Sequence, residues 1–243
     1  MTRAELIQSV SLRMDEITPG TALTDIAVDG SDNNPLYALI DGLIDSGVLE
    51  LYSIAPYWRL FQTDFTETAY EQLAVNDRYV LRIKVPDDFL RVAEIDCTGF
   101  QRPIVEVHLE QSDAGKRQHN RFLMGKEAKP VGVLSHGMWD VSGANEDPEL
   151  VPCREIDCYS LTGVSDGGNP PTIVPPSVTV TASYIPVPEQ ITDDLTTPVA
   201  VEDVVPSELI PALEWLIASR TFGARGDTNH AAICQQNAQN LLV

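Results

Sequence analysis

Four cysteines are the residues with the most varied chemistry in this chain, and two of them, Cys153 and Cys158, lie close together. Cysteine thiolates at short spacing bind zinc when both sulfur atoms can reach one ion. The intervening sequence, CREIDC, has the character of a β-strand, in which residues an odd number of positions apart point to opposite faces. We therefore expect reduced, packed thiols and no metal site. Four scattered cysteines are also too few for a disulfide scaffold.

Catalysis by an acid, a base or a nucleophile requires such groups to be held together. The chain lacks the G-x-S-x-G, G-x-x-x-x-G-K-[ST] and H-E-x-x-H motifs, and its four histidines are too far apart for a local metal-ligand signature. The pairs Asp87-Asp88 and Asp193-Asp194 have turn-like surroundings, where aspartate is favoured for local hydrogen bonds. We expect no catalytic residue, no metal and no cofactor. A hydrolase whose site is built from residues distant in sequence is the least favoured alternative.

The charge balance of the chain is strongly acidic, with 36 acidic and 16 basic residues and a formal net charge of −20. Its average field therefore repels nucleic acids and anionic membranes. One cluster departs from this average, because five cations gather around His119: Lys116, Arg117, Arg121, Lys126 and Lys129. The cluster fits either a site for an anion or acidic partner or a solvated helix face that offsets nearby carboxylates. We favour the solvated face.

The tripeptide Arg225-Gly226-Asp227 matches an integrin-binding motif. That motif acts on a flexible loop tip, whereas this copy falls between two predicted helices. Gly226 is expected to end the first helix and Asp227 to cap the second. We interpret the tripeptide as the end of one helix and the N-cap of the next.

The N-terminal part of the chain predicts two amphipathic helices. Thr2 and Glu5 form a capping box, and the apolar stripe that follows ends before Pro19-Gly20. The second helix is predicted to have Asn34 as its N-cap and Pro35 in its first turn. The first residues lack a basic-then-apolar signal pattern, and no apolar run approaches the roughly 18 residues of a membrane span. We expect no membrane insertion.

An aromatic connection follows these helices and contains Tyr57, Trp58 and Phe61. Large aromatic side chains mostly bury area in a core, although they can also form a ligand platform. We favour core packing.

From Tyr79 onward the hydrophobic period changes to two, which is typical of β-strands. Residues 79–85 and 89–95 flank Pro86-Asp87-Asp88 and predict a β-hairpin. Further strands are predicted over 104–109, 130–134, 138–141, 151–159 and 178–185.

The remaining segments of this central region predict connections. Residues 112–124 predict a polar helix capped by Ser112. The sequence SDGGNPPTIVPP at 165–176 predicts a loop or the tip of a long hairpin. Residues 186–206 are acidic and spaced by prolines, and we expect a strap that leads back to the terminal helices.

The last forty residues predict two helices separated by FGARG. The first is apolar on two faces, with Trp215 and Phe222 opposite a leucine-rich stripe. The second buries one face, composed of Ala231, Cys234, Ala238, Leu241 and Leu242, and carries carboxamides on the other. No residue from Thr228 to the end has a charged side chain, which suggests contact with another surface. The candidate interface residues are Trp215, Phe222, Gln235, Gln236, Gln239 and Asn240. Either neighbouring subunits or the β region of the same chain could cover them.

The order of these elements predicts an α+β fold. We expect an antiparallel bundle of N- and C-terminal helices with an inserted β-sandwich or curled antiparallel sheet. The predicted domains are 1–62, the N-terminal helices; 63–200, the inserted β-rich domain; and 201–243, the C-terminal helices that complete the bundle.

Four stretches of the sequence resemble the head-to-tail connector (adaptor, or ring) proteins of tailed bacteriophages. They are ELIQSVSLRMDEITPG, NPLYALIDGLI, VPDDFLRVAEIDCTGFQRPI and IPALEWLIASRTFGARGDTNHAA. The sequence is most similar to the ring proteins of crAss-like podoviruses. The resemblance implies helices packed around a ring, usually of twelve copies, that docks below the portal and presents a platform to the tail. It carries no active site. The chain is more acidic than that group leads one to expect.

Three functions follow as expectations, in order of preference. The first is a virion protein whose homo-oligomeric ring joins the portal to the tail or to further connector proteins and lets DNA pass without specific binding. A ring requires two different complementary patches on each subunit. The second is a β-rich binding module of a virion or secreted protein that uses the 165–176 tip, and the third is the hydrolase described above.

Overall fold

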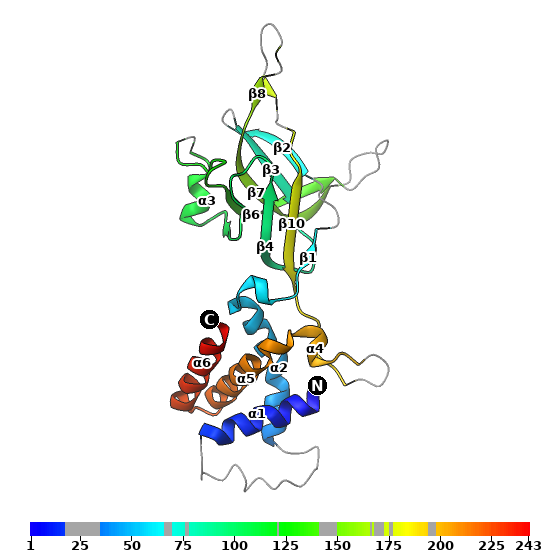
Figure 1. Cartoon of the computed structure of the whole chain (residues 1–243), viewed down its shortest axis with the longest axis vertical. Coiled ribbons are helices and arrows are strands. Elements are labelled where there is room, and N and C mark those ends of the chain that lie inside the picture. The colour runs from blue at the N-terminus through cyan, green and yellow to red at the C-terminus, as the bar shows by residue number, and fades with distance from the viewer. Residues whose placement is uncertain are drawn as a thin grey trace. The chain divides into compact units, whose positions relative to one another are not determined.

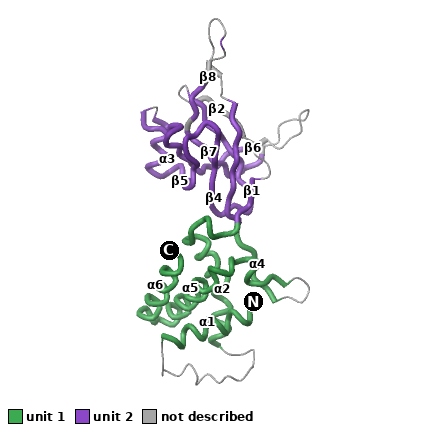
Figure 2. The backbone as a smooth tube through the Cα atoms, viewed as in Figure 1, with its two compact units in different colours: residues 1–61, 187–243 green, residues 62–186 purple. Residues whose placement is uncertain are grey.

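The chain folds into two units, one helical and one built from β-strands (Figure 1). The structure is a computed structural model that describes residues 1–17, 35–65, 70–75, 78–120, 122–140, 150–165, 167, 173–174, 177–193 and 198–243. Unit 1 comprises residues 1–61 and 187–243, and unit 2 comprises residues 62–186 (Figure 2). The α+β prediction is confirmed. The inserted domain was predicted over 63–200, whereas residues 187–200 belong to unit 1 in this division.

Unit 1 contains the four helices that local sequence signals predict, α1 (Arg3–Ile17), α2 (Pro35–Ile54), α5 (Ile210–Ala224) and α6 (Thr228–Leu242). It also contains the 3₁₀ turn η2 (Tyr57–Arg59), which lies in the predicted aromatic connection, and α4 (Val201–Val204), which lies in the predicted strap; neither was predicted to be helical. The 3₁₀ turn η3 (Ser207–Leu209) directly precedes α5. The capping box is confirmed, because the Glu5 amide donates to Thr2 Oγ1 at 3.1 Å and the Thr2 amide donates to Glu5 Oε2 at 2.8 Å. Pro35 opens α2 as predicted, and its predicted cap, Asn34, lies outside the described residues.

Helix α5 forms the centre of unit 1 and packs against α1, α2 and α6. Ten of its fifteen residues are buried, which explains why its sequence is apolar on two faces. Gly47 is buried in α2, where a Cβ atom would lie 2.7 Å from Cγ1 of Ile217. Glycine costs helix stability at this position, but it allows α2 and α5 to approach closely.

Ion pairs join the helices of unit 1 across long sequence separations. The buried carboxylate of Glu214 accepts hydrogen bonds from the Ser9 hydroxyl and from Arg13 Nε at 3.0 Å. Arg3 donates to Asp41 Oδ1 at 2.5 Å and to the Ile191 carbonyl at 2.7 Å. The bond to Ile191 is one of the contacts that attach the segment after residue 187 to α1.

Unit 2 contains two sheets and a short hairpin. A five-stranded mixed sheet has the order β2 (Tyr70–Val75), β3 (Arg78–Lys84), β7 (Leu150–Thr162), β6 (Val131–Asp140) and β5 (Val107–Leu109), in which only β5 and β6 are parallel. A three-stranded antiparallel sheet has the order β1 (Thr63–Asp64), β10 (Val180–Pro186) and β4 (Phe89–Cys97). The hairpin pairs β8 (Val164–Ser165) with β9 (Ile173–Val174).

The core of unit 2 lies between these two sheets. Leu81, Ile83 and Ile156 of the five-stranded sheet belong to the same buried cluster as Ile95 and Tyr184 of the three-stranded sheet. Two sheets around a shared core correspond to the sandwich, one of the two arrangements predicted for the inserted region, although the five-stranded sheet is mixed and not wholly antiparallel. Cys158 is buried in the cluster, and Cys153 is half-buried outside it, as their odd spacing in a strand predicts.

The predicted hairpin of residues 79–85 and 89–95 is wrong. Strand β3 pairs with β2 and β7, whereas β4 pairs with β10, so Pro86-Asp87-Asp88 leads from one sheet to the other. One nitrogen of Arg154, Nη2, donates to the carbonyl oxygens of Asp87 at 3.1 Å and Phe89 at 3.2 Å. The stabilising residue therefore lies about 65 positions away, where a local turn signal could not indicate it.

Two other local predictions in unit 2 differ from the structure. The helix predicted over 112–124 is only α3 (Asp113–Arg117), although Ser112 caps it as predicted. The side chain of Asn120 accepts a hydrogen bond from the Phe122 amide at 3.0 Å, a local bond that competes with helix formation. The strands predicted over 130–134 and 138–141 are the single strand β6. Strands β8 and β9 include the ends of the predicted 165–176 tip, most of which lies outside the described residues.

The expectation that the aromatic connection packs in the core is wrong for two of its three residues. Trp58 is 68% exposed and Phe61 is also exposed, while Tyr57 is half-buried in an edge-to-face contact with Trp58. The inward positions of this turn belong to the smaller side chains of Ala55 and Leu60.

Candidate subunit interface on the C-terminal helix

The turn between α5 and α6 fixes where α6 begins. Gly226 has a φ angle of +82°, a conformation that glycine adopts without steric cost. The Asp227 amide donates to the Phe222 carbonyl at 2.9 Å, and the Asp227 side chain accepts from the His230 amide at 3.2 Å. The predicted roles of Gly226 at the end of α5 and of Asp227 as the N-cap of α6 are confirmed.

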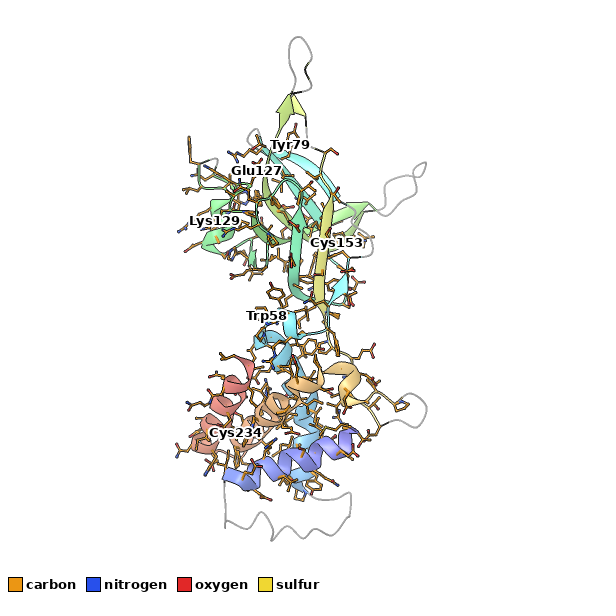
Figure 3. The ribbon with its side chains drawn as sticks, viewed as in Figure 1. Trp58, Tyr79, Glu127, Lys129, Cys153 and Cys234 are labelled. Carbon is orange, nitrogen blue, oxygen red and sulfur yellow. The ribbon has the colours of Figure 1, made fainter. Side chains whose placement is uncertain are left out.

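Helix α6 packs against α5 through a narrow stripe. Cys234, which is labelled in Figure 3, Ala238 and Leu242 are buried and recur every fourth residue. Burial raises the pKa of the Cys234 thiol to about 11, so the thiol is protonated at neutral pH. Ser219 of α5 donates to the Ala231 carbonyl at 2.8 Å and fixes the register of the two helices.

The outer face of α6 is broad and carries no charged side chain. Its exposed residues are Thr228, Asn229, Ala232, Ile233, Gln236, Gln239, Asn240 and Leu241. We call this set the α6 outer face. It combines carboxamides, which both donate and accept hydrogen bonds, with two exposed aliphatic side chains. Among the helices that the structure describes, α6 is the one without an acidic, lysine or arginine side chain.

Trp215 and Phe222, two of the predicted interface residues, lie buried inside unit 1. The guanidinium of Arg13 in α1 lies 5.4 Å from the Trp215 ring centre, and the His230 ring of α6 lies 5.3 Å from that of Phe222. Their cover therefore comes from the helices of their own unit. Neither a neighbouring subunit nor the β region is needed to bury them.

Gln235, a third predicted residue, belongs to a polar network that fixes the rotation of α6. Its Nε2 donates to Glu50 Oε1 of α2 at 3.3 Å. Glu50 is also paired with Arg220 of α5 at 2.6 Å, and Arg220 donates to the Ser46 hydroxyl at 3.0 Å. With Gln235 used internally, Gln236, Gln239 and Asn240 are the predicted residues that remain on the α6 outer face.

Two exposed aliphatic side chains of α6, Ile233 and Leu241, were not predicted. Leu241 was predicted on the buried face, but it is exposed together with Ile233. The buried stripe follows a strict spacing of four residues, and this spacing could have excluded Leu241. The carbonyl of Leu241 accepts a hydrogen bond from Arg59 Nη1 at 2.9 Å, which ties the end of α6 to η2 next to the exposed Trp58.

The described residues hold no group of three or more histidine, cysteine or acidic side chains placed to bind a metal ion. None of the described helices is long and apolar enough to cross a membrane. The chain matches no protein-family model and no curated protein.

Proposed function

We propose that this chain is a structural virion protein that forms a homo-oligomeric ring, of about twelve copies by the resemblance, at the junction of a phage head and tail. The α6 outer face is the observation that carries the proposal. The resemblance of four stretches of the sequence, three in the helical unit and one in the β unit, to phage connector proteins is the reason for proposing this kind of assembly. In that assembly the ring joins the portal to the tail or to further connector proteins.

Charge explains why the α6 outer face suits contact between identical copies. Each copy carries a formal charge of −20, so two copies repel each other wherever acidic surfaces meet. A helix face without charge removes that repulsion locally, and carboxamides can pair with one another without desolvating an ion. Ile233 and Leu241 add apolar area that gains free energy on burial.

Closure of a ring sets the geometry of this contact. Identical subunits related by rotation meet through two different patches, so the α6 outer face of one copy contacts another part of unit 1 on the next copy. Acidic surfaces that remain on the inside of such a ring offer no counter-charge to phosphates. DNA can then pass without being held.

Native mass spectrometry of the chain, alone and mixed with the portal protein from the same genome, tests this proposal. We expect a closed ring when the portal is present. This expectation holds even if the chain alone is monomeric. A chain that remains monomeric and does not bind the portal would contradict the proposal.

Replacing carboxamides by carboxylates of the same size tests the α6 outer face. The triple variant Gln236→Glu, Gln239→Glu, Asn240→Asp keeps the size of each side chain and adds three charges to each contact. We expect it to fold normally and to lose ring assembly. Gln8→Glu adds a carboxylate to an exposed amide position of α1 and is expected to assemble as the unmodified chain does.

A further inference from the structure

A second surface with the character of a docking site lies in unit 2, in the segment of residues 112–129. This segment contains α3 and the turns that follow it, and it stands at one side of unit 2 (Figure 1). It includes the basic cluster that we interpreted from the sequence as a solvated helix face. The structure shows a short helix followed by tight turns in place of that long face.

The 112–129 segment is attached to the outer side of the five-stranded sheet. Met124 is buried in a small cluster with Val80, Val133 and Tyr159. Gly125 passes so close to β7 that a Cβ atom there would lie 2.6 Å from the Tyr159 carbonyl oxygen. The segment is therefore held against the sheet by its own packing.

Hydrogen bonds fix the turns of the same segment. The buried side chain of Gln118 donates to the Ala114 carbonyl at 2.8 Å and accepts from the Gly125 amide at 2.6 Å. Glu127, which is labelled in Figure 3, accepts a hydrogen bond from the Thr162 amide of β7 at 2.9 Å. A contact made by this segment would cost little ordering entropy.

Two large apolar side chains are displayed by this fixed framework. Phe122 is 85% exposed and Leu123 is 58% exposed, although Met124 directly after them is buried. Leu109, at the end of β5 beside α3, is 64% exposed. A rigid element that presents an aromatic and two aliphatic side chains to water is typical of an interaction site.

The charge around these apolar residues is opposite to that of the rest of the chain. Three of the four lysines lie in the segment, at positions 116, 126 and 129, and they are exposed together with Arg117. Residues 112–129 carry five cations against two carboxylates, so the remaining residues carry a net charge of −23. A copy of this chain is therefore an acidic partner for its own basic segment.

We propose that the 112–129 segment docks on an acidic surface of a second copy of this chain, with Phe122 and Leu123 inserted at the contact and Lys116, Lys126 and Lys129 around them. This inference rests on the proposed ring, in which it supplies a contact between β units in addition to that of α6. The two surfaces in this contact differ, as head-to-tail assembly requires. A nucleic acid or an anionic membrane is disfavoured as the partner, because the charge of −23 elsewhere opposes the approach of either.

Site-specific photo-crosslinking of the full chain tests the inference. Phe122 is replaced by benzoylphenylalanine, and the products are analysed for the isolated chain and for the chain assembled on its portal. We expect a crosslink from Phe122 to an acidic peptide of another copy. Raising NaCl to about 1 M, where the screening length is about 3 Å, is expected to lower its yield about tenfold.

Matched variants separate the surface from general effects on folding. Lys126→Glu with Lys129→Glu, introduced into the crosslinking chain, is expected to abolish the crosslink while unit 2 stays folded. Leu12→Ser changes an exposed leucine of α1, 63% exposed, and is expected to leave the crosslink unchanged.

The outcomes distinguish this inference from the proposed function. A ring on the portal without a crosslink between copies would overturn the inference and leave the proposed ring intact, as would a crosslink to the portal itself. Binding of double-stranded DNA or of phosphatidylglycerol vesicles that Lys126→Glu with Lys129→Glu abolishes, without a crosslink between copies, would assign the segment to that partner instead. Failure of the chain to form a ring would overturn the proposed function, whatever Phe122 contacts.

Discussion

The two units differ in how the segments of the chain that form them are joined. In unit 1, ion pairs join segments from the two ends of the chain, such as Arg13 of α1 with Glu214 of α5. In unit 2, the ion pair of Arg82 with Asp157 joins two neighbouring strands of one sheet, because these residues face each other in register on β3 and β7. Unit 1 is thus defined by contacts between distant segments, whereas unit 2 is one continuous stretch of chain. We therefore expect unit 2 to fold without unit 1, and we expect that half of unit 1 cannot fold alone.

The largest expected effect comes from separating the two units. A fragment of residues 62–186 contains the whole sandwich core, so we expect dispersed amide resonances in its NMR spectrum. A fragment of residues 1–61 lacks α5, the centre of unit 1, and is expected to show the narrow dispersion of an unfolded chain. Adding a peptide of residues 187–243 should restore dispersion to it. A folded 1–61 fragment on its own would contradict the comparison.

Core truncations in each unit are expected to have the next largest effect. Leu216→Ala in α5 and Ile156→Ala in β7 each remove a fully buried side chain and should lower the free energy of unfolding by about 2–5 kcal/mol. If each unit has its own cooperative core, each substitution weakens only its own unit. Pulsed alkylation in urea measures this directly, because the buried thiol of Cys234 reports on unit 1 and that of Cys158 on unit 2.

Each of these two variants is controlled by the urea midpoint of the thiol in the other unit. Leu216→Ala should shift the urea midpoint for Cys234 and leave the midpoint for Cys158 in place, and Ile156→Ala should do the reverse. Equal shifts of both midpoints in either variant would show a single cooperative unit. Cys153, which is half-buried, is expected to react first in every variant.

Removal of one arginine in each unit is expected to have a smaller effect. Arg13→Ala leaves the buried carboxylate of Glu214 without its ion-pair partner, which should cost about 2 kcal/mol, since Arg13 itself is partly exposed. Arg154→Met removes the hydrogen bonds at the corner between β3 and β4 and should cost about 1–2 kcal/mol. Urea denaturation followed by circular dichroism measures both losses.

Conservative variants sharpen this comparison. Glu214→Gln keeps a hydrogen-bonding group without leaving a buried charge, so it should cost less than Arg13→Ala. One nitrogen of Arg154 makes the corner bonds, and Arg154→Lys should therefore retain part of the stability that Arg154→Met loses. Equal losses for lysine and methionine would show that packing over Phe89, and not the hydrogen bonds, holds the corner.

The same contrast explains which features the sequence could predict. Capping by Thr2, Ser112 and Asp227 depends on bonds between residues three positions apart, and each of these predictions is confirmed. The partner of β4 was predicted wrongly, because Arg154 and β10 lie far along the chain and an alternating pattern does not specify which strand is adjacent. Fold class follows from patterns within segments, but sheet order depends on contacts between them.

The candidate surfaces divide in the same way. The absence of charge on α6 can be seen in the sequence, and it led to the prediction of Gln236, Gln239 and Asn240 as interface residues. The three side chains are exposed in the structure, and their place in an interface stays a prediction. Trp215 and Phe222 could not be placed, since their cover comes from Arg13, more than 200 positions away from Trp215, and from His230 across a helix turn. The exposure of Phe122 and Leu123 depends on how the buried Gln118 and Met124 shape the turns around them, which composition does not reveal.

The smallest expected effect is a pH dependence confined to the start of α6. The hydrogen bonds of Asp227 with His230 hold the pKa of that carboxyl below its ordinary value. Because the pKa is lower in the folded state, the carboxylate contributes stability above its unfolded pKa of about 4, and this contribution is lost as the pH falls through the folded pKa. Asp227→Asn keeps an N-cap of similar quality but cannot titrate. The hydrogen-exchange protection factors of the first-turn amides of α6 should therefore fall at acid pH more in the unmodified chain than in Asp227→Asn. Because Asp227 lies in unit 1, the amides of β7 in unit 2 should be equally protected in both proteins. Equal acid sensitivity of α6 in both would show that Asp227 caps the helix without its charge contributing.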